Sequence, residues 1–332
     1  MRVHVEAIGG HPLAETVRSL ATHAARHELD PSPSTADLVL LCGTFTRDPH
    51  SLTRHRLYLT CREKCAVYTG DDAYLPLAPG VYTSPRRGLS TRLGRVRSYG
   101  FVSSYGLHAN QAVNEASRGS GSQRQRERRL LFSFEGSPTS RLRRRLFSFS
   151  FDPALALVRD TTTSYSHFDH AATGRQSGQA RYVETMLDSR FVLCPRGVGT
   201  GTLRLFESMS LGVAPVLLSD DYVLPRGPRW DTFLVRVRES RLSGLPDALA
   251  AISASSATRG ELARRAWEAW FAPEVAFDNL VDAAGAALSA GPVVQALYRR
   301  LEPVLVGSFR LRTHGIGMAG RIASRLRSYP RR

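Results

Sequence analysis

The 332-residue sequence predicts an α/β protein with two doubly wound parallel sheets. Three observations favour this class. Apolar strand patterns alternate with helical patterns in both halves of the chain. Several strands are apolar along their whole length, as in sheets whose two faces are covered by helices. A run poor in apolar residues separates the halves, and the chain length fits two domains better than one.

The first half begins with a strand, a helix and a buried strand. Apolar and polar residues alternate over 3–7, which predicts a strand. Apolar residues then recur at helical spacing over 13–24. The run ADLVLLC at 36–42 is almost continuously apolar, as expected for a buried strand. Further short strands are expected at 56–60, 66–69 and 100–103.

The segment 109–127 gathers Ser, Gly, Gln and Arg without apolar periodicity, and it predicts a linker or flexible loop. We therefore place an N-terminal Rossmann-like domain at 1–125, a second at 126–290, and a C-terminal helix with a basic tail at 291–332. The second domain is expected to have strands at 130–134, 146–149, 154–158, 191–194, 213–219 and 233–237. Its helices are expected at 182–187, 202–211 and 245–252, with helical patterns alone from 259 onward.

The chain is strongly basic, with a formal net charge of +16 at pH 7 and a pI near 10.6. Such a charge favours polyanions, acidic membrane surfaces or phosphate-bearing small molecules as partners. Lys64 is the only lysine, and a GC-rich genome would also produce this arginine bias. The densest cluster comprises Arg124, Arg126, Arg128, Arg129, Arg141, Arg143, Arg144 and Arg145. It offers the alternative of a non-catalytic polyanion or nucleic-acid binder, but it lacks base-stacking aromatics, and we expect no nucleic-acid partner.

The sequence indicates a cytoplasmic protein. Its N-terminus lacks the apolar core of a signal peptide, and no apolar run approaches about 20 residues. The four cysteines have neither disulfide-framework nor zinc-site spacing, so a reducing compartment is expected. The segment from Tyr298 onward contains nine arginines and one acidic residue, Glu302. This basic tail is either solvated or in peripheral contact with an anionic membrane, at the inner face, or with a lipid diphosphate.

The stretch FVLCPRGVGTGTLRLFESMSLGVAPVLLSDDYVLP, 191–225, has the organisation of a ligand site. A strand ends in a glycine-rich loop that opens a helix, the position where α/β sheets bind ligands. Arg196 offers a bidentate fork for phosphate oxygens. Glycines let the backbone approach a ligand, and threonines can cap the helix; these residues are Gly197, Gly199, Gly201, Thr200 and Thr202. A glycine turn without a ligand is the structural alternative.

Three acids follow that loop. Glu207 lies among apolar helix residues, where a carboxylate could accept both hydroxyls of a ribose or could simply face solvent. Asp220 and Asp221 end the next strand at the same edge of the sheet. They could bind sugar hydroxyls or a metal ion, or serve as ordinary loop acids.

This stretch resembles the exostosin-like domain of glycosyltransferase family 47. The resemblance rests on F-x-L-C-P-R-G at 191–197, R-L-x-E-x-M at 204–209, G-x-x-P-V at 212–216 and S-D-D-Y-x-L-P at 219–225. Weaker similarity extends to YVETMLDSRFVLCP at 182–195 and to LLFSFEGSPTSRLRRRL at 130–146. The glycine loop GVGTGTLRL departs from animal members, which tend to have an aromatic residue and a serine there. The chain looks like a compact, bacterial-type member.

The resemblance implies a GT-B architecture, with two Rossmann-like domains facing across a cleft. It also implies an inverting transferase that moves a sugar from a nucleoside-diphosphate sugar, with a UDP-sugar expected first. The donor would bind the C-terminal domain, and a glycan or glycolipid acceptor of cell-surface polysaccharide synthesis would bind mainly the N-terminal one. No metal or other cofactor is expected. Heparan synthesis is not implied, because the chain lacks an anchor and the second catalytic domain of the animal polymerases.

Inverting transfer needs a base for the acceptor hydroxyl and positive groups for the departing diphosphate. Asp71, Asp72 and Glu135 are the candidate bases, expected across the cleft from the donor. Arg196 is the leading candidate for stabilising the leaving group, together with the 197–202 loop. Arg141 and Arg143 are further candidates for that role.

Overall fold

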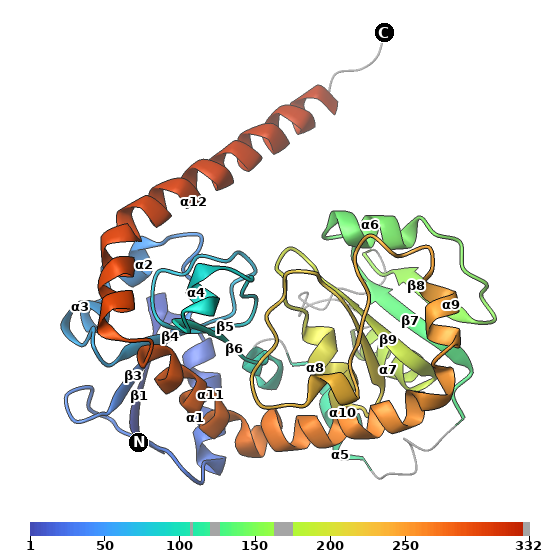
Figure 1. Cartoon of the computed structure of the whole chain (residues 1–332), viewed down its shortest axis with the longest axis horizontal. Helices are drawn as coiled ribbons and strands as arrows, with labels where there is room; N and C mark the ends of the chain where they lie inside the picture. Colours follow the sequence, from blue (N-terminus) through green and yellow to red (C-terminus); the bar gives the residue numbers. More distant parts are fainter. Residues whose placement is uncertain (107–108, 120–126, 163–174, 328–332) are drawn as a thin grey trace.

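The structure is a computed structural model that describes residues 1–106, 109–119, 127–162 and 175–327. It contains two sheets, one of six strands and one of five, each flanked by helices (Figure 1). Every paired strand in both sheets is parallel. The predicted class is confirmed: two Rossmann-like α/β halves and a set of C-terminal helices form a GT-B architecture.

The first sheet has the strand order β2-β1-β3-β4-β5-β6. Its strands are β1 (Arg2–Ala7), β2 (Glu28–Leu29), β3 (Leu38–Gly43), β4 (Cys65–Thr69), β5 (Gly80–Tyr82) and β6 (Val96–Ser98). All residues of β3 and β4 are buried, because these central strands are covered on both faces. The helices of this half are α1 (Leu13–Leu20), α2 (His50–Thr53), α3 (Arg56–Thr60) and α4 (Leu89–Arg92). The next helix along the chain, α5 (Gln111–Arg118), packs on helices of the second half.

Two predicted strands of the first half are wrong. Residues 56–60 form α3, and 100–103 run into a 3-10 helix, η3 (Val102–Tyr105). Short apolar runs do not distinguish a strand from a helical turn, and the three strands that were missed, β2, β5 and β6, have only two or three residues each. The predicted linker also contains α5, which is capped by the Asn110 side chain accepting from the Val113 amide. The proposed boundary at 125 lies outside the described residues.

The second sheet has the order β11-β10-β9-β7-β8. Its strands are β7 (Leu130–Gly136), β8 (Ala156–Asp160), β9 (Ser189–Pro195), β10 (Ala214–Leu218) and β11 (Val235–Arg236). The helices that follow are α6 (Arg141–Phe147), α7 (Arg175–Leu187), α8 (Leu203–Ser210), α9 (Leu245–Ala250), α10 (Ser256–Trp270), α11 (Pro273–Leu288) and α12 (Pro292–Arg327). The strand predicted at 146–149 is wrong, since α6 extends to Phe147 and buries Leu142 and Leu146 at helical spacing.

The chain crosses back to the first half near its end. Helix α10 packs on the second sheet and on α8, whereas α11 packs on β4, β5 and β6 of the first sheet. Figure 1 shows α10 running beneath the second half and leading to α11 on the other side. The predicted boundary at residue 290 assigned α11 to the second domain, and the structure places it on the first. Helical periodicity identified the helix but could not tell which sheet it covers.

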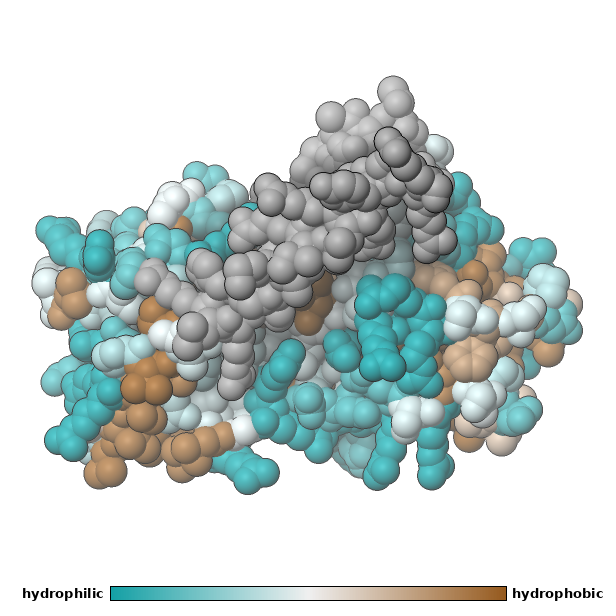
Figure 2. All heavy atoms as spheres, turned by 90° about the horizontal axis from the view of Figure 1, so that it is seen from above, coloured by the Kyte–Doolittle hydropathy of each residue, from teal (hydrophilic) through white to brown (hydrophobic). Residues whose placement is uncertain are grey.

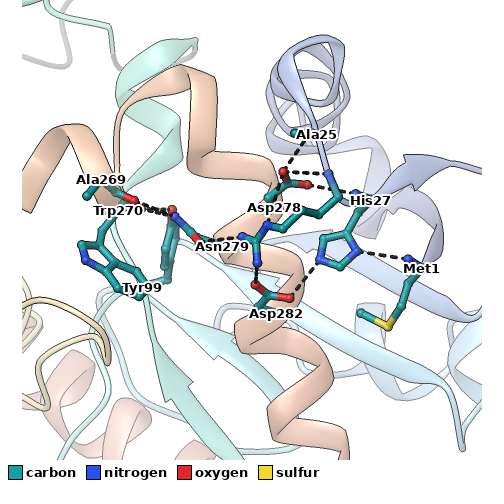
Figure 3. A network of polar contacts seen from close by, with 10 residues as sticks. Met1, Ala25, His27, Tyr99, Ala269, Trp270, Asp278, Asn279 and Asp282 are labelled. Carbon is teal, nitrogen blue, oxygen red and sulfur yellow. Dashed lines mark hydrogen bonds and ion pairs between the residues drawn. The ribbon is translucent and has the colours of Figure 1, made fainter.

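A buried carboxylate anchors α11 on the first half (Figure 3). Asp278 is 4% exposed, and its oxygens accept hydrogen bonds from the backbone amides of Ala25, Arg26 and His27 at 2.9, 3.1 and 3.1 Å. Asp282, one turn later, accepts from the side chains of Arg26 and His27 at the surface. Three otherwise unpaired amides are therefore satisfied by one side chain of a helix 250 residues away.

Aromatic side chains join the two halves beside this anchor. The ring of Phe206 in α8 lies 4.9 Å from Phe271 at the end of α10 and 6.0 Å from Phe101 of the first half, measured between centroids. Tyr99 lies 5.4 Å from Phe271, and its hydroxyl donates to the Trp270 carbonyl at 2.6 Å. One continuous apolar core therefore includes residues of both halves.

Helix α12 leaves the first half and projects away from the body (Figure 1). Its first turns pack through Leu305, Val306 and Phe309 against the core of the first half, as the predicted C-terminal helix requires. Val293 and Val304 of the same turns are exposed. In the described part of the chain, no single helix has the length and apolarity to cross a membrane. The pair Pro273–Leu288 and Pro292–Phe309 passes that test together but is bent by 85°.

We predict that Asp278→Asn lowers the free energy of unfolding by about 2–4 kcal/mol, because an amide cannot accept from three backbone donors as a carboxylate does. Urea denaturation measures this change. Asp282→Asn is the matched control on the next turn. Its side chain is 44% exposed, so the expected loss is below about 1 kcal/mol. Equal losses in the two variants would contradict the anchoring role of Asp278.

Candidate functional site

A cavity of about 350 Å³ lies between the two halves, at the carboxyl ends of strands from both sheets. Gly70 follows β4 of the first sheet, while Gly136, Thr161 and Gly197 follow or end β7, β8 and β9 of the second. The side chains that give the cavity its chemistry are Asp72, Phe101, Ser103, Glu135, Thr139, Arg143, Arg181, Tyr182, Arg204 and Glu207. Ligands of open parallel sheets bind at this edge.

Arg143 is held in the cavity wall by the start of α6. The Ser140 hydroxyl caps this helix by accepting from the Arg143 amide at 3.2 Å. The Arg143 guanidinium donates to the carbonyl of Pro195 at 3.1 and 3.3 Å and to that of Ser137 at 3.3 Å. Burial, and then the positive charge of Arg204, lower the pKa of Arg143 to about 10. An anionic ligand would relieve both effects.

A second arginine belongs to a buried network on α7 and α8. The Tyr182 hydroxyl donates to Glu207 Oε2 at 2.6 Å and accepts from Arg204 Nε at 3.1 Å. The Arg204 guanidinium also lies 4.5 Å from the Phe134 ring centroid and donates to the carbonyl of Glu135. Burial opposes the charge of Arg204, but Tyr182 and Glu207 outweigh it and raise its pKa. Glu207 is thus buried and partnered, and the exposed-acid alternative is wrong.

Glu135 lies on the second-half side of the cavity, although the sequence analysis expected it with Asp71 and Asp72 on the opposing side. It ends β7 of the second sheet and is 4% exposed. Its Oε1 pairs with Arg159 Nη1 at 3.0 Å and with Arg181 Nε at 3.9 Å. Two arginines therefore compensate this carboxylate, which fits a positioning or binding role better than that of a base acting from the other half.

The adjacent aspartates of the first half differ in their surroundings. Asp71 accepts hydrogen bonds from the amides of Phe45 and Thr46 and from the hydroxyls of Thr46 and Thr69, between 2.6 and 3.3 Å. Through these hydrogen bonds the Asp71 carboxylate holds the loop that follows β3. Asp72 instead lines the cavity. Loss of hydration raises the pKa of Asp72, the Asp71 carboxylate raises it further, and Arg143 opposes both.

The glycine loop makes a tight contact between the halves. A Cβ on Gly199 would lie 2.6 Å from Ser84 Oγ, and one on Gly201 would lie 2.3 Å from the Thr83 carbonyl oxygen. The Gly201 amide donates to Ser84 Oγ at 3.3 Å, and the Thr200 hydroxyl donates to the Pro85 carbonyl at 3.0 Å. These glycines therefore permit approach of the 83–85 segment. Gly197, Gly201 and Thr202 also line the cavity, whereas Gly199 and Thr200 do not.

Besides Gly199 and Thr200, four predicted donor residues lie outside the cavity lining. Arg196 Nε pairs with Glu239 Oε1 at 2.7 Å. The Asp220 amide donates to Glu239 Oε1 and the Glu239 amide donates to Asp220 Oδ1, both at 3.2 Å. Asp221 and Arg141 are exposed and do not line the cavity. The structure thus differs from the prediction for Arg196, whose place among the cavity cations is taken by Arg143, Arg181 and Arg204. The motif spacing identified the segment but not which way each side chain points.

The basic cluster of the sequence is dispersed. Arg128 donates to the carbonyls of Ser189 and Gly212, and Arg129 pairs with Asp188 at 2.6 Å. Arg143 lies in the cavity wall, and Arg145 donates to the Glu239 carbonyl. Arg124 and Arg126 lie outside the described residues. Within the described ranges, no three His, Cys, Asp or Glu residues gather in a way that could hold a metal ion.

The part of the chain that builds most of this cavity is similar to known proteins. A model of the exostosin GT47 domain matches residues 100–252. A 58-residue segment is 41% identical to a probable glycosyltransferase of Arabidopsis thaliana, covering 17% of this chain and 12% of that protein. A 74-residue segment is 32% identical to an exostosin-1 homolog of Caenorhabditis elegans, covering 22% of this chain and 19% of that protein.

The fold consists of two Rossmann-like halves with a cavity between them, and residues 100–252 match the exostosin GT47 domain, the family that the sequence resembles. The matched segments span less than a fifth of the length of these two relatives. Among solved structures, MurG of Acinetobacter baumannii aligns over 85% of this chain and 99% of its own, at 10% identity and a TM-score of 0.34.

Arg204, Arg181 and Tyr182 are among the cavity residues that the sequence analysis did not select. Arg204 belongs to the matched motif and precedes Glu207 by three residues, so helical geometry puts the two on one face of α8. This spacing could have indicated from the sequence that Arg204 lies beside Glu207. Arg181 and Tyr182 reach the cavity from α7, and their proximity to α8 depends on packing that no spacing rule contains.

We predict that Gly201→Ala destabilises the contact between the halves by about 1–3 kcal/mol, because its Cβ would overlap a backbone oxygen. Gly197→Ala is the control in the same loop. Its Cβ would meet the Thr139 hydroxyl oxygen at 3.3 Å, a side-chain neighbour that can shift. Thermal denaturation should show a larger loss for Gly201→Ala. The same melting temperature in both variants would contradict the close-approach role of Gly201.

Proposed function

We propose that this protein is an inverting glycosyltransferase that moves a sugar from a nucleoside-diphosphate sugar to a glycan or glycolipid acceptor of cell-surface polysaccharide synthesis. The observation that carries the proposal is the cavity itself. It combines arginines and a helix N-terminus from the GT47 half with a carboxylate from the opposing half. Such a pairing matches the needs of a reaction in which a diphosphate leaves on one side and a hydroxyl is deprotonated on the other.

The donor diphosphate would lie at the start of α8. Gly201, Thr202 and Leu203 line the cavity there, and the first amides of a helix have no partner within it. Arg143 and Arg204 flank the same space and supply permanent positive charge to the departing diphosphate. Glu207 would accept ribose hydroxyls while Tyr182 holds its other side. A UDP-sugar is the first donor to test.

Asp72 is the base in this proposal. It approaches the cavity from the first half, opposite the arginines, and its raised pKa makes it a better proton acceptor than an ordinary aspartate. The acceptor would enter beside Asp72, Phe101 and Ser103. Arg143 stabilises the ionised form of Asp72, so the carboxylate is ready for the acceptor proton. No step of this scheme needs a metal ion or another cofactor.

In this proposal the enzyme works in the cytoplasm, at the inner face of the membrane, and exposed apolar groups beside basic sequence support that location. Val293, Leu297 and Val304 expose apolar side chains on the first turns of α12, and the sequence after them is rich in arginine. Figure 2 shows exposed apolar residues at the left of the view from above, the side of the first half in Figure 1, and also at the right. Apolar and basic groups together favour anionic bilayers.

We predict that UDP, or the diphosphate of the true donor, raises the melting temperature. At about 100 times its dissociation constant a ligand stabilises the folded state by about 2.7 kcal/mol. Differential scanning fluorimetry with UDP, GDP, CDP and ADP measures the shift. Arg204→Met should remove it, and Arg196→Ala should retain it because Arg196 lies outside the cavity. Where Arg204→Met folds poorly, Arg181→Gln serves, since the Arg181 side chain is 45% exposed.

Two results would contradict the donor site. One is a shift that survives Arg204→Met and Arg181→Gln but disappears in Arg196→Ala. The other is the absence of a shift with every diphosphate, combined with RNA or DNA binding that weakens steeply with salt. That combination would favour the polyanion binder.

We predict that Asp72→Asn binds the donor diphosphate normally but lowers turnover at least 100-fold, because an amide cannot take the acceptor proton. The acid limb of the pH profile of kcat/KM should lie above the usual aspartate range. Activity should rise as pH increases through the raised pKa, since only the ionised carboxylate is a base. Asp48→Asn, on an exposed loop of the same half, is the control. Unchanged turnover in Asp72→Asn would exclude this residue as the base.

A further inference from the structure

A second cavity, of about 540 Å³, lies at the elbow between α11 and α12 and shares no lining residue with the first. It is bounded by the first half on one side and by the start of α12 on the other. Its lining comprises Tyr58, Arg62, Glu63, Pro79, Arg95, Leu288, Ser289, Gly291, Pro292, Gln295 and Arg299. Three of these residues are arginines and one is an acid, so the cavity carries a positive balance.

Arg95 is the unusual member of this lining. It is 2% exposed and is the largest of the nearly inaccessible side chains in the described chain. Its Nη2 donates to the Leu77 carbonyl at 2.6 Å, and its Nη1 donates to the Gln295 side chain. The guanidinium also lies 4.8 Å from the ring centroid of Tyr298. Its Nε is buried without an acceptor.

No carboxylate pairs with Arg95 among the described residues. Its hydrogen-bond partners are a carbonyl and an amide, both neutral, and burial lowers its pKa. Buried charges are normally paired, because removing a cation from water is costly without a compensating anion. Arg62, by contrast, is paired with Glu302 of α12 at 2.5 Å. The remaining positive charge in the cavity belongs to Arg95 and to the exposed Arg299.

We propose that this cavity binds a phosphate-bearing group, with Arg95 and Arg299 as its cationic ligands. A planar guanidinium with an unused N–H suits a phosphate oxygen, and an anion would compensate the charge that the protein leaves unpaired. The volume exceeds that of one phosphate, so the site accommodates a diphosphate or a phosphate joined to a small polar group. Free phosphates and lipid headgroups share this chemistry.

The site would also control how α12 is held. Arg95 precedes β6 of the first sheet, whereas Gln295 and Arg299 belong to α12. An anion bound between them would add a charged contact to the Gln295 and Tyr298 contacts that already join helix and sheet. Since α12 projects from the body, occupancy would stabilise the base of that helix. The inference does not depend on the proposed transferase activity.

The test compares Arg299→Gln with Arg300→Gln in the full chain. Both residues are exposed neighbours on α12, but only Arg299 lines the cavity. Melting temperature and isothermal titration are measured with inorganic phosphate, pyrophosphate and glycerol 3-phosphate at constant ionic strength in chloride. Flotation with phosphatidylcholine vesicles, with and without phosphatidic acid, tests the headgroup source. We expect Arg299→Gln to weaken binding at least tenfold and Arg300→Gln to leave it unchanged.

Arg95→Met provides the second variant. It should fold, because it replaces an unpaired buried charge with an apolar side chain of similar length, and it should lose the phosphate-dependent shift. If Arg95→Met does not fold, the comparison of Arg299→Gln with Arg300→Gln alone tests the proposed phosphate site. Binding of the soluble phosphates identifies a free ligand. If the protein binds phosphatidic acid vesicles but no soluble phosphate, and Arg299→Gln abolishes the vesicle binding, the ligand is a lipid headgroup.

Three results would overturn the proposal. One is no binding of any probe by the unaltered protein. Another is equal loss, or no loss, in Arg299→Gln and Arg300→Gln. The third is a phosphate shift that Arg143→Met removes and Arg299→Gln retains, which would place the anion in the first cavity.

Discussion

The crossing of the chain from the second half back to the first is the constraint on which the cavity depends. Helix α11 ends the chain's path through the second half but packs on the first sheet, and the buried Asp278 carboxylate fixes it there through three backbone amides. The aromatic contacts of Phe206 and Phe271 lie beside this anchor. The crossing thus adds helix and aromatic contacts to those that the 197–202 loop makes with residues 83–85.

The loops in contact across the cavity show a second consequence of this arrangement. Glycines that would conventionally be assigned to phosphate binding also let the 197–202 loop meet residues 83–85 at distances that a side chain would block. The same few residues of this loop thus have to allow both the close packing of the halves and the access of a ligand to the N-terminus of α8. A change at Gly201 therefore affects stability and the proposed donor site together, whereas Gly197 separates the two effects.

The role of an arginine in this structure depends on its partners and not on how many arginines surround it in the sequence. Many arginines that crowd the sequence are satisfied by carbonyls or surface acids, as with Arg128 and Arg129. The arginines with chemical consequences line the two cavities, Arg143 and Arg204 the first and Arg95 the second. Loss of hydration lowers the pKa of Arg143 and of Arg95, so these two positions favour an anionic ligand, whereas Tyr182 and Glu207 already stabilise the charge of Arg204. Net charge predicted anionic partners but could not locate them.

The sequence by itself determined the α/β class, the central strands, the helix of the motif and the GT47 assignment, because these follow from local periodicity and residue spacing. Asp72, Arg143 and Glu207, which it proposed as site residues, line the first cavity, and their roles stay predictions. Tertiary structure decided the rest: that Arg196 turns to Glu239, that Asp71 serves a loop, that Tyr182 and Arg181 enter from α7, and that α11 covers the first sheet. Side-chain direction and helix placement depend on contacts between segments far apart in the chain, and local patterns carry no information about them.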